Sequence, residues 1–308
     1  MPDQTGARAT LPRMSSGESA VSIRHSSGAV SPLTLLRQGV TEILSRRRLV
    51  RYLVSADMKK RGSDTLLGNL WWVLDPLLQM VVYVVFVTVI SKRATPDYPL
   101  FIFAAILPWK WFSAVTGDAT TSVVRQEKLI RSIAFPKLVL PVAETTAGVV
   151  GFAWGLVPLA GLLILDSNRL TLMLLWIPVI AAVQYVFTLA MAILVSAANV
   201  YFRDLGNAVG HVLRLWWFLS PGLYSLASLE ELHTIKDHPI IGFLAAANPF
   251  AILFEAYRSV IYGTADGVGM PFAPDVASLF YLLLASFVFL GICIVFFKRL
   301  EPDFAKVL

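Results

Sequence analysis

The sequence contains little charge, little cysteine and little histidine, and each shortage excludes a class of protein. Charged residues make up 15% of the 308 residues, whereas soluble domains average about 25%. A single cysteine, Cys293, excludes a disulfide framework within one chain. The four histidines are scattered and no cysteine cluster accompanies them, so we expect no metal site.

Signatures of nucleotide-binding and hydrolytic enzymes are also missing. No lysine is followed by Ser or Thr, so no phosphate-binding loop can be drawn. Neither a G-x-S-x-G nucleophile elbow nor an H-E-x-x-H zinc motif occurs. We therefore expect no catalytic residues and no cofactor in this chain.

What the sequence does contain is apolar residues, at 56% of the chain with a mean hydropathy of +0.68. A soluble protein with such a surface would aggregate, so the composition predicts an integral membrane protein. The net charge of +6 also invites a nucleic-acid interpretation. Because the cations lie in segments beside apolar stretches, membrane topology explains them better, and no nucleic-acid partner is expected.

Two segments precede the apolar stretches. Residues 1–33 are rich in Ser, Gly and Pro, which predicts a disordered cytoplasmic tail. Residues 34–66 form a basic amphipathic interface region, typical of a helix that lies against anionic headgroups. Its apolar face carries Leu49, Val50, Leu53, Val54 and Met58, and its opposite face carries Arg48, Arg51, Ser55 and Lys59. An ordinary solvated helix before the first span remains the alternative.

The apolar stretches predict an all-α transmembrane domain over 67–298. Six spans are expected at 70–91, 99–122, 138–165, 172–198, 208–227 and 276–297. The second is expected to break near Pro108. A further stretch at 239–262 is cut by Asn248-Pro249 into pieces too short to cross, which favours a re-entrant outer hairpin.

Charge asymmetry predicts the orientation. With six spans, most cations fall in the segments before the first span, between the second and third, and in the cytoplasmic tail 299–308. Both termini are therefore expected in the cytoplasm of a multi-pass protein. The carboxylates Asp75, Asp118 and Glu144 lie in or near spans, where charge is expected to be functional. For Asp75 and Asp118 the alternative is a position near the cytoplasmic face or a pair with a basic neighbour.

The segment 125–137 is short, amphipathic and basic. It could form one or two helical turns across a partner surface, with Pro136 ending the helix, and an inert turn fits equally well.

Aromatic residues gather in three clusters, around Trp71, Trp109 and Trp216. Interfacial belts enrich Trp and Tyr, but Trp216-Trp217 lie about 13 Å into the fifth expected span, too deep for a belt. If the helix continues, Trp217, Ser220, Pro221 and Tyr224 share one face. Such a face could let a sugar chain slide along it, or could simply pack in a dimer seam.

Several motifs in order resemble the permease subunits of ABC-2-type polysaccharide exporters, which move O-antigen, teichoic acid, capsule and galactan chains. The matching stretches are the basic helix at 46–61, Leu67-Gly68-Asn69-Leu70-Trp71-Trp72, Asp75-Pro76-Leu77, Leu107-Pro108-Trp109-Lys110-Trp111-Phe112-Ser113, Phe135-Pro136-Lys137 with Leu140-Pro141, Tyr201-Phe202-Arg203-Asp204-Leu205, Ser220-Pro221-Gly222-Leu223-Tyr224, Asn248-Pro249-Phe250 with Glu255-Ala256-Tyr257-Arg258, and Arg299-Leu300-Glu301-Pro302-Asp303-Phe304-Ala305. Each is short, and their order gives the resemblance its specificity. Lys110 departs from the pattern, where a small polar residue is usual.

The resemblance implies a homodimer in the bacterial cytoplasmic membrane, bound to two ABC ATPase subunits that hold ATP and Mg²⁺. It assigns ATPase coupling to Arg131, Phe135, Pro136 and Lys137. It implies that the interface helix holds a lipid diphosphate near Arg51, Lys59, Lys60 and Arg61. The outer gate hairpin would be 239–262, and the substrate channel would include Trp217, Ser220, Pro221 and Tyr224. The expected cargo is a lipid-linked polysaccharide, and no bond chemistry is expected of the permease.

Three alternatives remain. A polyprenyl-phosphate glycosyltransferase would need acidic metal-binding clusters in loops, which the sequence lacks. An ABC-2 exporter of a small lipid or drug usually carries a large external domain after the first span, for which residues 92–98 leave no room. The third is a membrane scaffold. The glycan itself is not named by the sequence, although 17 Arg against 9 Lys hints at a GC-rich source and leans toward an actinobacterial galactan.

Overall fold

The computed structural model describes residues 31–63, 67–90, 97–132, 135–225, 248–264 and 268–308. Within these ranges the chain is helical, with no β-strand, and residues 32–308 form one compact unit. The expected N-terminal tail lies almost wholly outside the described residues. The helices are α1 (Pro32–Ser45), α2 (Arg47–Ser63), α3 (Trp71–Val84), α4 (Tyr98–Ser122), α5 (Glu127–Ser132), α6 (Val139–Leu165), α7 (Ile177–Tyr201), α8 (Leu205–Leu219), α12 (Pro249–Ile261), α13 (Val276–Leu300) and α14 (Phe304–Val307).

Five helical segments among the described residues are long and apolar enough to cross a membrane. They are Trp71–Val89, Tyr98–Ser132, Val139–Leu165, Leu172–Tyr201 and Val276–Val307. These segments coincide with five of the six expected spans, which confirms an all-helical integral membrane protein. The short π-helical turn Val85–Ile90 extends α3.

The fifth expected span, 208–227, is not one continuous helix. Its helix α8 begins at Leu205 and ends at Leu219, where Ser220 adopts an extended conformation. Fifteen helical residues reach about 22 Å, short of the roughly 30 Å hydrocarbon core. The expectation of a helix through residue 227 is therefore wrong, and the chain turns at Ser220-Pro221-Gly222.

The expected break at Pro108 is also wrong, because α4 runs unbroken through it for 25 residues. The Gln184 side chain of α7 donates a hydrogen bond from Nε2 to the Pro108 carbonyl at 2.8 Å. In the most apolar stretch of α4, 78% of residues are buried, against 11% in α3. Proline removes one backbone hydrogen bond from the helical turn at residue 108, and packing around this buried helix stabilises that turn.

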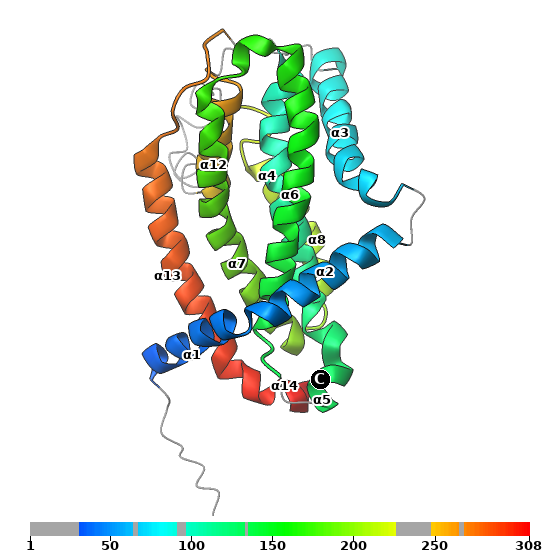
Figure 1. Cartoon of the computed structure of the whole chain (residues 1–308), viewed down its shortest axis with the longest axis vertical. Coiled ribbons are helices and arrows are strands. Elements are labelled where there is room, and N and C mark those ends of the chain that lie inside the picture. The colour runs from blue at the N-terminus through cyan, green and yellow to red at the C-terminus, as the bar shows by residue number, and fades with distance from the viewer. Residues whose placement is uncertain (1–30, 64–66, 91–96, 133–134, 226–247, 265–267) are drawn as a thin grey trace, which may run out of the picture. The chain divides into compact units, whose positions relative to one another are not determined.

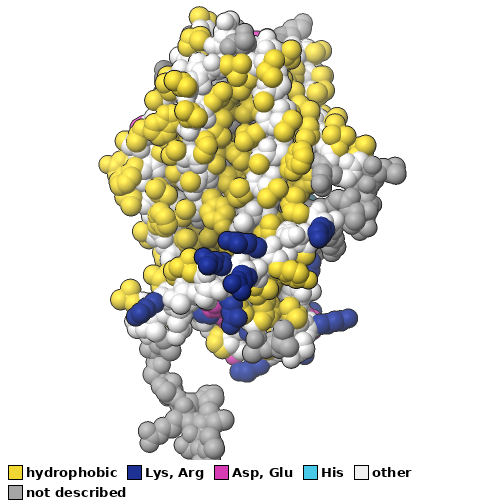
Figure 2. Space-filling view, viewed as in Figure 1, with side chains coloured by type: hydrophobic (Ala, Val, Ile, Leu, Met, Phe, Trp, Pro, Cys, Tyr) yellow, Lys and Arg dark blue, Asp and Glu magenta, His cyan; other side chains and the backbone are white. Residues whose placement is uncertain are grey.

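One end of the bundle carries the short amphipathic elements. In Figure 1, α1 and α2 cross the lower part of the bundle, and α5, α14 and the C-terminus lie at its lower end. On the face shown in Figure 2, Lys and Arg gather over this part, and hydrophobic side chains cover the bundle above it. We call this end of the bundle, with α1, α2, α5 and α14, the basic end.

The amphipathic pattern of α2 is confirmed by its burial. Val50 is buried, Leu49, Leu53, Val54 and Met58 are partly buried, and Arg48, Arg51, Ser55 and Lys59 are exposed. The apolar side of α2 packs against α6, and α1 packs against α13. The helix thus covers the bundle with one face and presents its cations on the other.

The expected hairpin 239–262 is described only from residue 248. Asn248 is extended and accepts a hydrogen bond from the Phe250 backbone N–H at 3.0 Å, and Pro249 begins α12. The break expected at Asn248-Pro249 is confirmed. The 13 residues of α12 span about 20 Å and pack against α4, α7 and α13, while residues 239–247 lie outside the described ranges.

Candidate functional site

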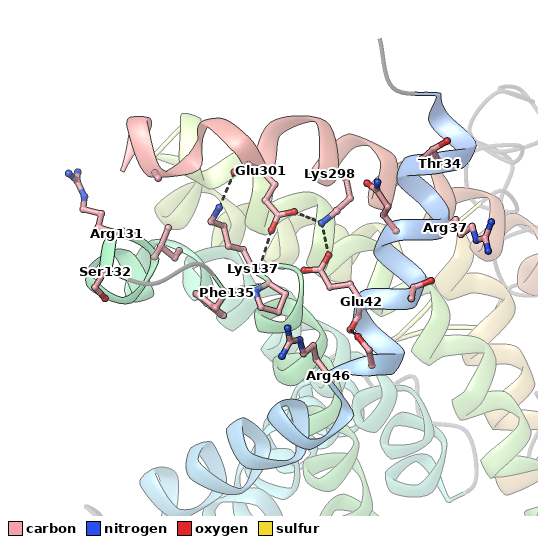
Figure 3. Close-up of a pocket in the computed structure, with 16 residues that line it drawn as sticks. Thr34, Arg37, Glu42, Arg46, Arg131, Ser132, Phe135, Lys137, Lys298 and Glu301 are labelled. Carbon is pink, nitrogen blue, oxygen red and sulfur yellow. Dashed lines mark hydrogen bonds and ion pairs between the residues drawn. The ribbon is translucent and has the colours of Figure 1, made fainter. Parts of the chain in front are cut away.

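A cleft of about 920 Å³ opens at the basic end, between α1, the segment around α5 and the end of α13. We call it the basic cleft (Figure 3). Its charged lining consists of the cations Arg37, Arg46, Arg131, Lys137 and Lys298 and the carboxylates Glu42 and Glu301. Five cations against two carboxylates leave a positive surplus, which suits an acidic or anionic partner.

All four residues that the sequence analysis assigned to ATPase coupling line the basic cleft. Phe135 is half-buried and packs on a core cluster that includes Ile130 of α5. Arg131 is exposed, its Nε lies 3.1 Å from Glu127 Oε1, and its guanidinium points away from the other labelled charges in Figure 3. The segment is thus anchored by apolar contacts on one side and open on the other; residues 133–134 lie outside the described ranges.

Ion pairs connect the three walls of the cleft. Lys298 Nζ of α13 lies 2.5 Å from Glu42 Oε2 of α1 and 2.6 Å from Glu301 Oε2. The Lys137 backbone N–H donates to Glu301 Oε1 at 3.2 Å, and Lys137 Nζ donates to the Glu301 carbonyl at 3.2 Å. Figure 3 shows these contacts as one chain of charges. A displacement of the segment before α6 would therefore act on α13 and α1 together.

The cations assigned to the interface helix lie on α2, outside the cleft. Arg51 and Lys59 are exposed on the polar face of this helix. The side chains of Lys60 and Arg61 lie outside the described part of the chain. Exposed cations on an amphipathic helix suit contact with anionic headgroups.

The aromatic face expected at Trp217, Ser220, Pro221 and Tyr224 does not exist as one helical face, because α8 ends at Leu219. Trp217 is 2% exposed, and its ring centroid lies 5.5 Å from that of Trp109 and 5.7 Å from that of Phe254. Within one subunit Trp217 therefore packs in the core. The turn after Ser220 redirects the chain, so Pro221 and Tyr224 do not continue the helical face that carries Trp217.

Hydrogen bonds fix that turn to the start of α12. Asn248 Nδ2 donates to Ser220 Oγ at 2.8 Å, and Trp216 Nε1 donates to Asn248 Oδ1 at 3.2 Å. Ser220 Oγ donates in turn to the Trp216 carbonyl at 2.8 Å. Asn248 thus caps α12 and holds the end of α8 with one side chain.

Arg258 of α12 holds the same turn from the other side. Arg258 is 2% exposed, and its guanidinium donates to the carbonyls of Pro221 at 2.7 Å and of Tyr224 at 3.0 Å, with a further bond to the Gly222 carbonyl. It also lies over the Phe101 ring, 3.8 Å from the centroid. We call Ser220, Pro221, Gly222, Asn248 and Arg258 the outer knot. Arg258, which the sequence analysis placed in the expected outer hairpin, donates its hydrogen bonds to buried backbone carbonyls.

The intramembrane carboxylates have basic neighbours. Asp75 of α3 forms an ion pair with Lys110 of α4. Lys110 is the residue of the Leu107–Ser113 motif that departs from the family pattern. Glu144 Oε1 of α6 lies 3.4 Å from the Arg125 guanidinium, which also donates to the Asp118 carbonyl at 2.7 Å. The alternative that Asp75 pairs with a basic neighbour is confirmed.

Sequence reasoning missed the residues whose roles depend on distant partners. Glu42, Lys298 and Glu301 come from opposite ends of the chain, and no local pattern joins them. A weak signal existed for Lys298 and Glu301, since cations and carboxylates three residues apart on a helix are neighbours.

An all-helical bundle with at least five membrane-length helices and a basic end defines a multi-pass membrane protein. No protein-family model matches the sequence. The chain is 32% identical over 267 residues to the O-antigen export system permease protein RfbA of Myxococcus xanthus, covering 87% of this chain and 98% of that relative. Two proteins of the same name from Klebsiella pneumoniae are each 25% identical, across 84% of this chain and 95% of their own length. The chain therefore belongs to the family of ABC-2-type O-antigen export permeases.

Proposed function

We propose that this chain is the membrane-spanning subunit of an ATP-driven exporter of lipid-linked polysaccharide, with O-antigen the favoured cargo. The observation that carries the proposal is the 32% identity across 98% of a relative named as an O-antigen export permease. The exporter contains two copies of this chain and two ABC ATPase subunits, which bind ATP and Mg²⁺. The permease supplies the pathway, and the cargo glycan crosses without a covalent step in this chain.

The polar face of α8 supports a pathway next to a second copy. Asn207, His211 and Arg214 follow helical spacing and are exposed, as is Phe218 one turn further. Such polar groups are costly against lipid, so they face a water-filled path or another subunit. This face replaces the one expected at Trp217, Ser220, Pro221 and Tyr224 as the wall of the pathway. Of those four residues, only Tyr224 is more than slightly exposed in the single chain.

The basic cleft is the proposed docking site of the ATPase. Phe135 holds the segment on the core, Arg131 points outward, and the surplus of cations favours an acidic ATPase surface. Closure of the ATPase pair around ATP would move this segment. The chain Lys137–Glu301–Lys298–Glu42 would carry the movement to α13 and α1.

The interface helix α2 is the proposed resting place of the lipid diphosphate. Arg51 and Lys59 on its exposed face, with Lys60 and Arg61 next in sequence, supply cations at the level where headgroups lie. The basic end is then cytoplasmic, which places both termini in the cytoplasm of a six-span protein. In this topology α12 belongs to a re-entrant hairpin at the outer face, and α8 is the incomplete fifth span.

A deletion experiment in the native host tests the proposal. Removing the permease gene should abolish surface polysaccharide and cause lipid-linked glycan to accumulate in the cytoplasmic membrane. Restoring the wild-type chain should reverse both effects. Normal surface polysaccharide in the deletion strain, with no accumulated intermediate, would refute the proposed cargo.

A further inference from the structure

A groove of about 530 Å³ lies between α1 and the second half of α13, two helices that pack side by side at the basic end in Figure 1. We call it the α1–α13 groove. Leu33 and Leu36 of α1 lie on one wall, and Phe287, Ile292 and Phe296 of α13 lie on the other. The groove shares no lining residue with the basic cleft, so docking of the ATPase does not account for it.

Helical spacing makes the groove continuous along α13. Lining residues at i, i+4 spacing form one row, which consists of Phe287, Gly291, Val295 and Arg299. Gly291 leaves a hollow in this row, because a Cβ added there would meet Leu36 Cδ1 only at 3.9 Å, an ordinary van der Waals contact. The ion pair between Glu42 and Lys298 holds α1 beside the row.

The length of the groove matches one leaflet of a bilayer. The expected span 276–297 on α13 measures about 32 Å, close to the roughly 30 Å hydrocarbon core. Phe287 and Phe296, near the two ends of the apolar floor, are about 14 Å apart along the helix, and half of that core is about 15 Å. The apolar part of the groove therefore lies in the leaflet nearest the basic end.

The floor of the groove is apolar and exposed. Phe287, Val288 and Ile292 are each more than half exposed in the chain. Residues 1–31, which precede α1, are rich in Ser, Gly and Pro and offer few bulky apolar side chains to cover such a floor. Lipid tails are as apolar as these side chains, so a hydrocarbon chain suits the groove.

A single cation stands where the apolar floor ends. Arg299 is exposed and lies one helical turn beyond Val295, about 6 Å further along the axis. The described residues that line the groove include no carboxylate. Lys298 pairs with Glu42 and Glu301, whereas Arg299 forms no ion pair with any residue that the structure describes. A guanidinium at headgroup level suits a lipid phosphate.

We propose that the α1–α13 groove binds an anionic phospholipid, with one acyl chain on the apolar floor and the headgroup phosphate at Arg299. A zwitterionic phospholipid offers the same chains without the net charge, so Arg299 should favour the anionic lipid. The inference goes beyond the proposed function and does not depend on it, because it requires only a bilayer and these two helices. It gives a role to Arg299, which the proposed export mechanism leaves unused.

Native mass spectrometry of the purified full-length chain tests the headgroup contact. The probes are phosphatidylglycerol and phosphatidylethanolamine with identical acyl chains. The wild-type chain should bind phosphatidylglycerol about fivefold more tightly, and Arg299→Gln should remove this preference. Arg48→Gln on α2 is the matched control, because Arg48 is exposed but does not line the groove, and it should keep the preference. Equal binding of both lipids by the wild-type chain, or an unchanged preference in Arg299→Gln, would overturn the proposal.

Filling the hollow tests the acyl-chain contact. Gly291→Leu should lower the binding of both phospholipids severalfold, counted per folded chain. Gly161→Leu on α6 is the control, because Gly161 is exposed, has no atom within 4 Å of an added Cβ and does not line the groove. Binding of both lipids at the wild-type level by Gly291→Leu would contradict a chain in the groove.

Photo-reactive benzoylphenylalanine at position 292, in proteoliposomes of equal phosphatidylglycerol and phosphatidylethanolamine, identifies the occupant. Position 82 on α3 is the control, because Val82 and Ile292 are similarly exposed, at 64% and 61%. Position 292 should capture phosphatidylglycerol in excess, and position 82 should capture both lipids in the bulk ratio. Capture at 292 of a second copy of the chain, of residues 1–30, or of both lipids in the bulk ratio would overturn the proposal. Added polyprenyl diphosphate should leave the capture unchanged; displacement of phosphatidylglycerol would assign the groove to the cargo lipid and overturn the proposal as well.

Discussion

The outer knot and the basic cleft use the same kinds of side chain for opposite purposes. In the outer knot, the buried guanidinium of Arg258 and the amide of Asn248 are satisfied by backbone carbonyls and by Ser220. In the basic cleft, Lys298 and Lys137 contact carboxylates at the edge of an open cleft, and Arg131 points outward. The first arrangement fixes a turn permanently, whereas the second can be rearranged by a partner.

The difference follows from burial. A buried charge that loses its partners costs several kcal/mol, so the outer knot cannot open without a large penalty. The ion pairs of the basic cleft are less enclosed, with Lys298, Glu42 and Glu301 side chains 13%, 19% and 12% exposed, so water and other charges can replace them at lower cost than in the outer knot. The proposed function requires both, a fixed frame at one end and a replaceable set of contacts at the proposed docking site of the ATPase.

Arg258→Met should have the largest effect on the free energy of unfolding. Arg131→Met is its control, because it makes the same chemical change in the basic cleft. Arg258→Met leaves buried carbonyls without a donor and should lower the free energy of unfolding by about 3–5 kcal/mol. Arg131→Met, on an exposed side chain, should change it by less than about 0.5 kcal/mol. Equilibrium unfolding in mixed SDS–detergent micelles measures both; equal effects would contradict the contrast between the regions.

Trp217→Ala should have the second-largest effect on the free energy of unfolding. Because Trp217 is buried against Trp109 and Phe254, its removal should cost about 3–4 kcal/mol of stability. Trp71→Ala, at an exposed position, is the control and should cost far less. Export per correctly folded complex should stay unchanged in Trp217→Ala, whereas a specific loss of export per complex would restore this residue to the pathway.

Asn248→Ala tests the weaker part of the outer knot. It removes the N-cap of α12 and the bonds to Ser220 and Trp216, and should cost about 2 kcal/mol. Asn207→Ala on the exposed face of α8 provides the comparison. The same unfolding titration measures both, and an unchanged midpoint for Asn248→Ala would show that the turn holds without its cap.

The smallest effect on stability belongs to Glu42→Gln in the basic cleft. It keeps a hydrogen-bond acceptor for Lys298, whose second carboxylate partner Glu301 is unchanged. Because the Lys298 and Glu42 side chains are only 13% and 19% exposed, we expect a loss of about 1 kcal/mol, at the upper end for surface pairs. High salt should shrink the difference from the wild-type chain, because screening weakens ion pairs near water. A loss as large as that of Arg258→Met would mean that the cleft is part of the fixed frame.

Much of this architecture could be predicted from the sequence, because membrane helices depend on long apolar runs. Five spans, the amphipathic face of α2 and the break before Pro249 follow from periodicity and from proline, which are local properties. The four residues to which the resemblance assigns ATPase coupling line one cleft, and their coupling role stays a prediction.

The errors arose where distant residues override local preference. Pro108 suggested a break, but burial of α4 and the Gln184 side chain, 76 residues away, support a continuous helix. The end of α8 at Leu219 depends on Arg258 and Asn248, neither of which is near it in sequence. Helical spacing alone therefore gave Trp217 and Tyr224 a common face that the turn removes.

The central claim is that ATP hydrolysis by a partner reaches this permease through the segment at the basic cleft. Proteoliposomes that contain the permease, its ATPase and lipid-linked glycan test it most directly, by comparing the wild-type chain with the double variant Phe135→Ala, Pro136→Ala. We expect both complexes to hydrolyse ATP and only the wild-type complex to export glycan. Export at the wild-type rate by the double variant, with assembly unchanged, would contradict the claim.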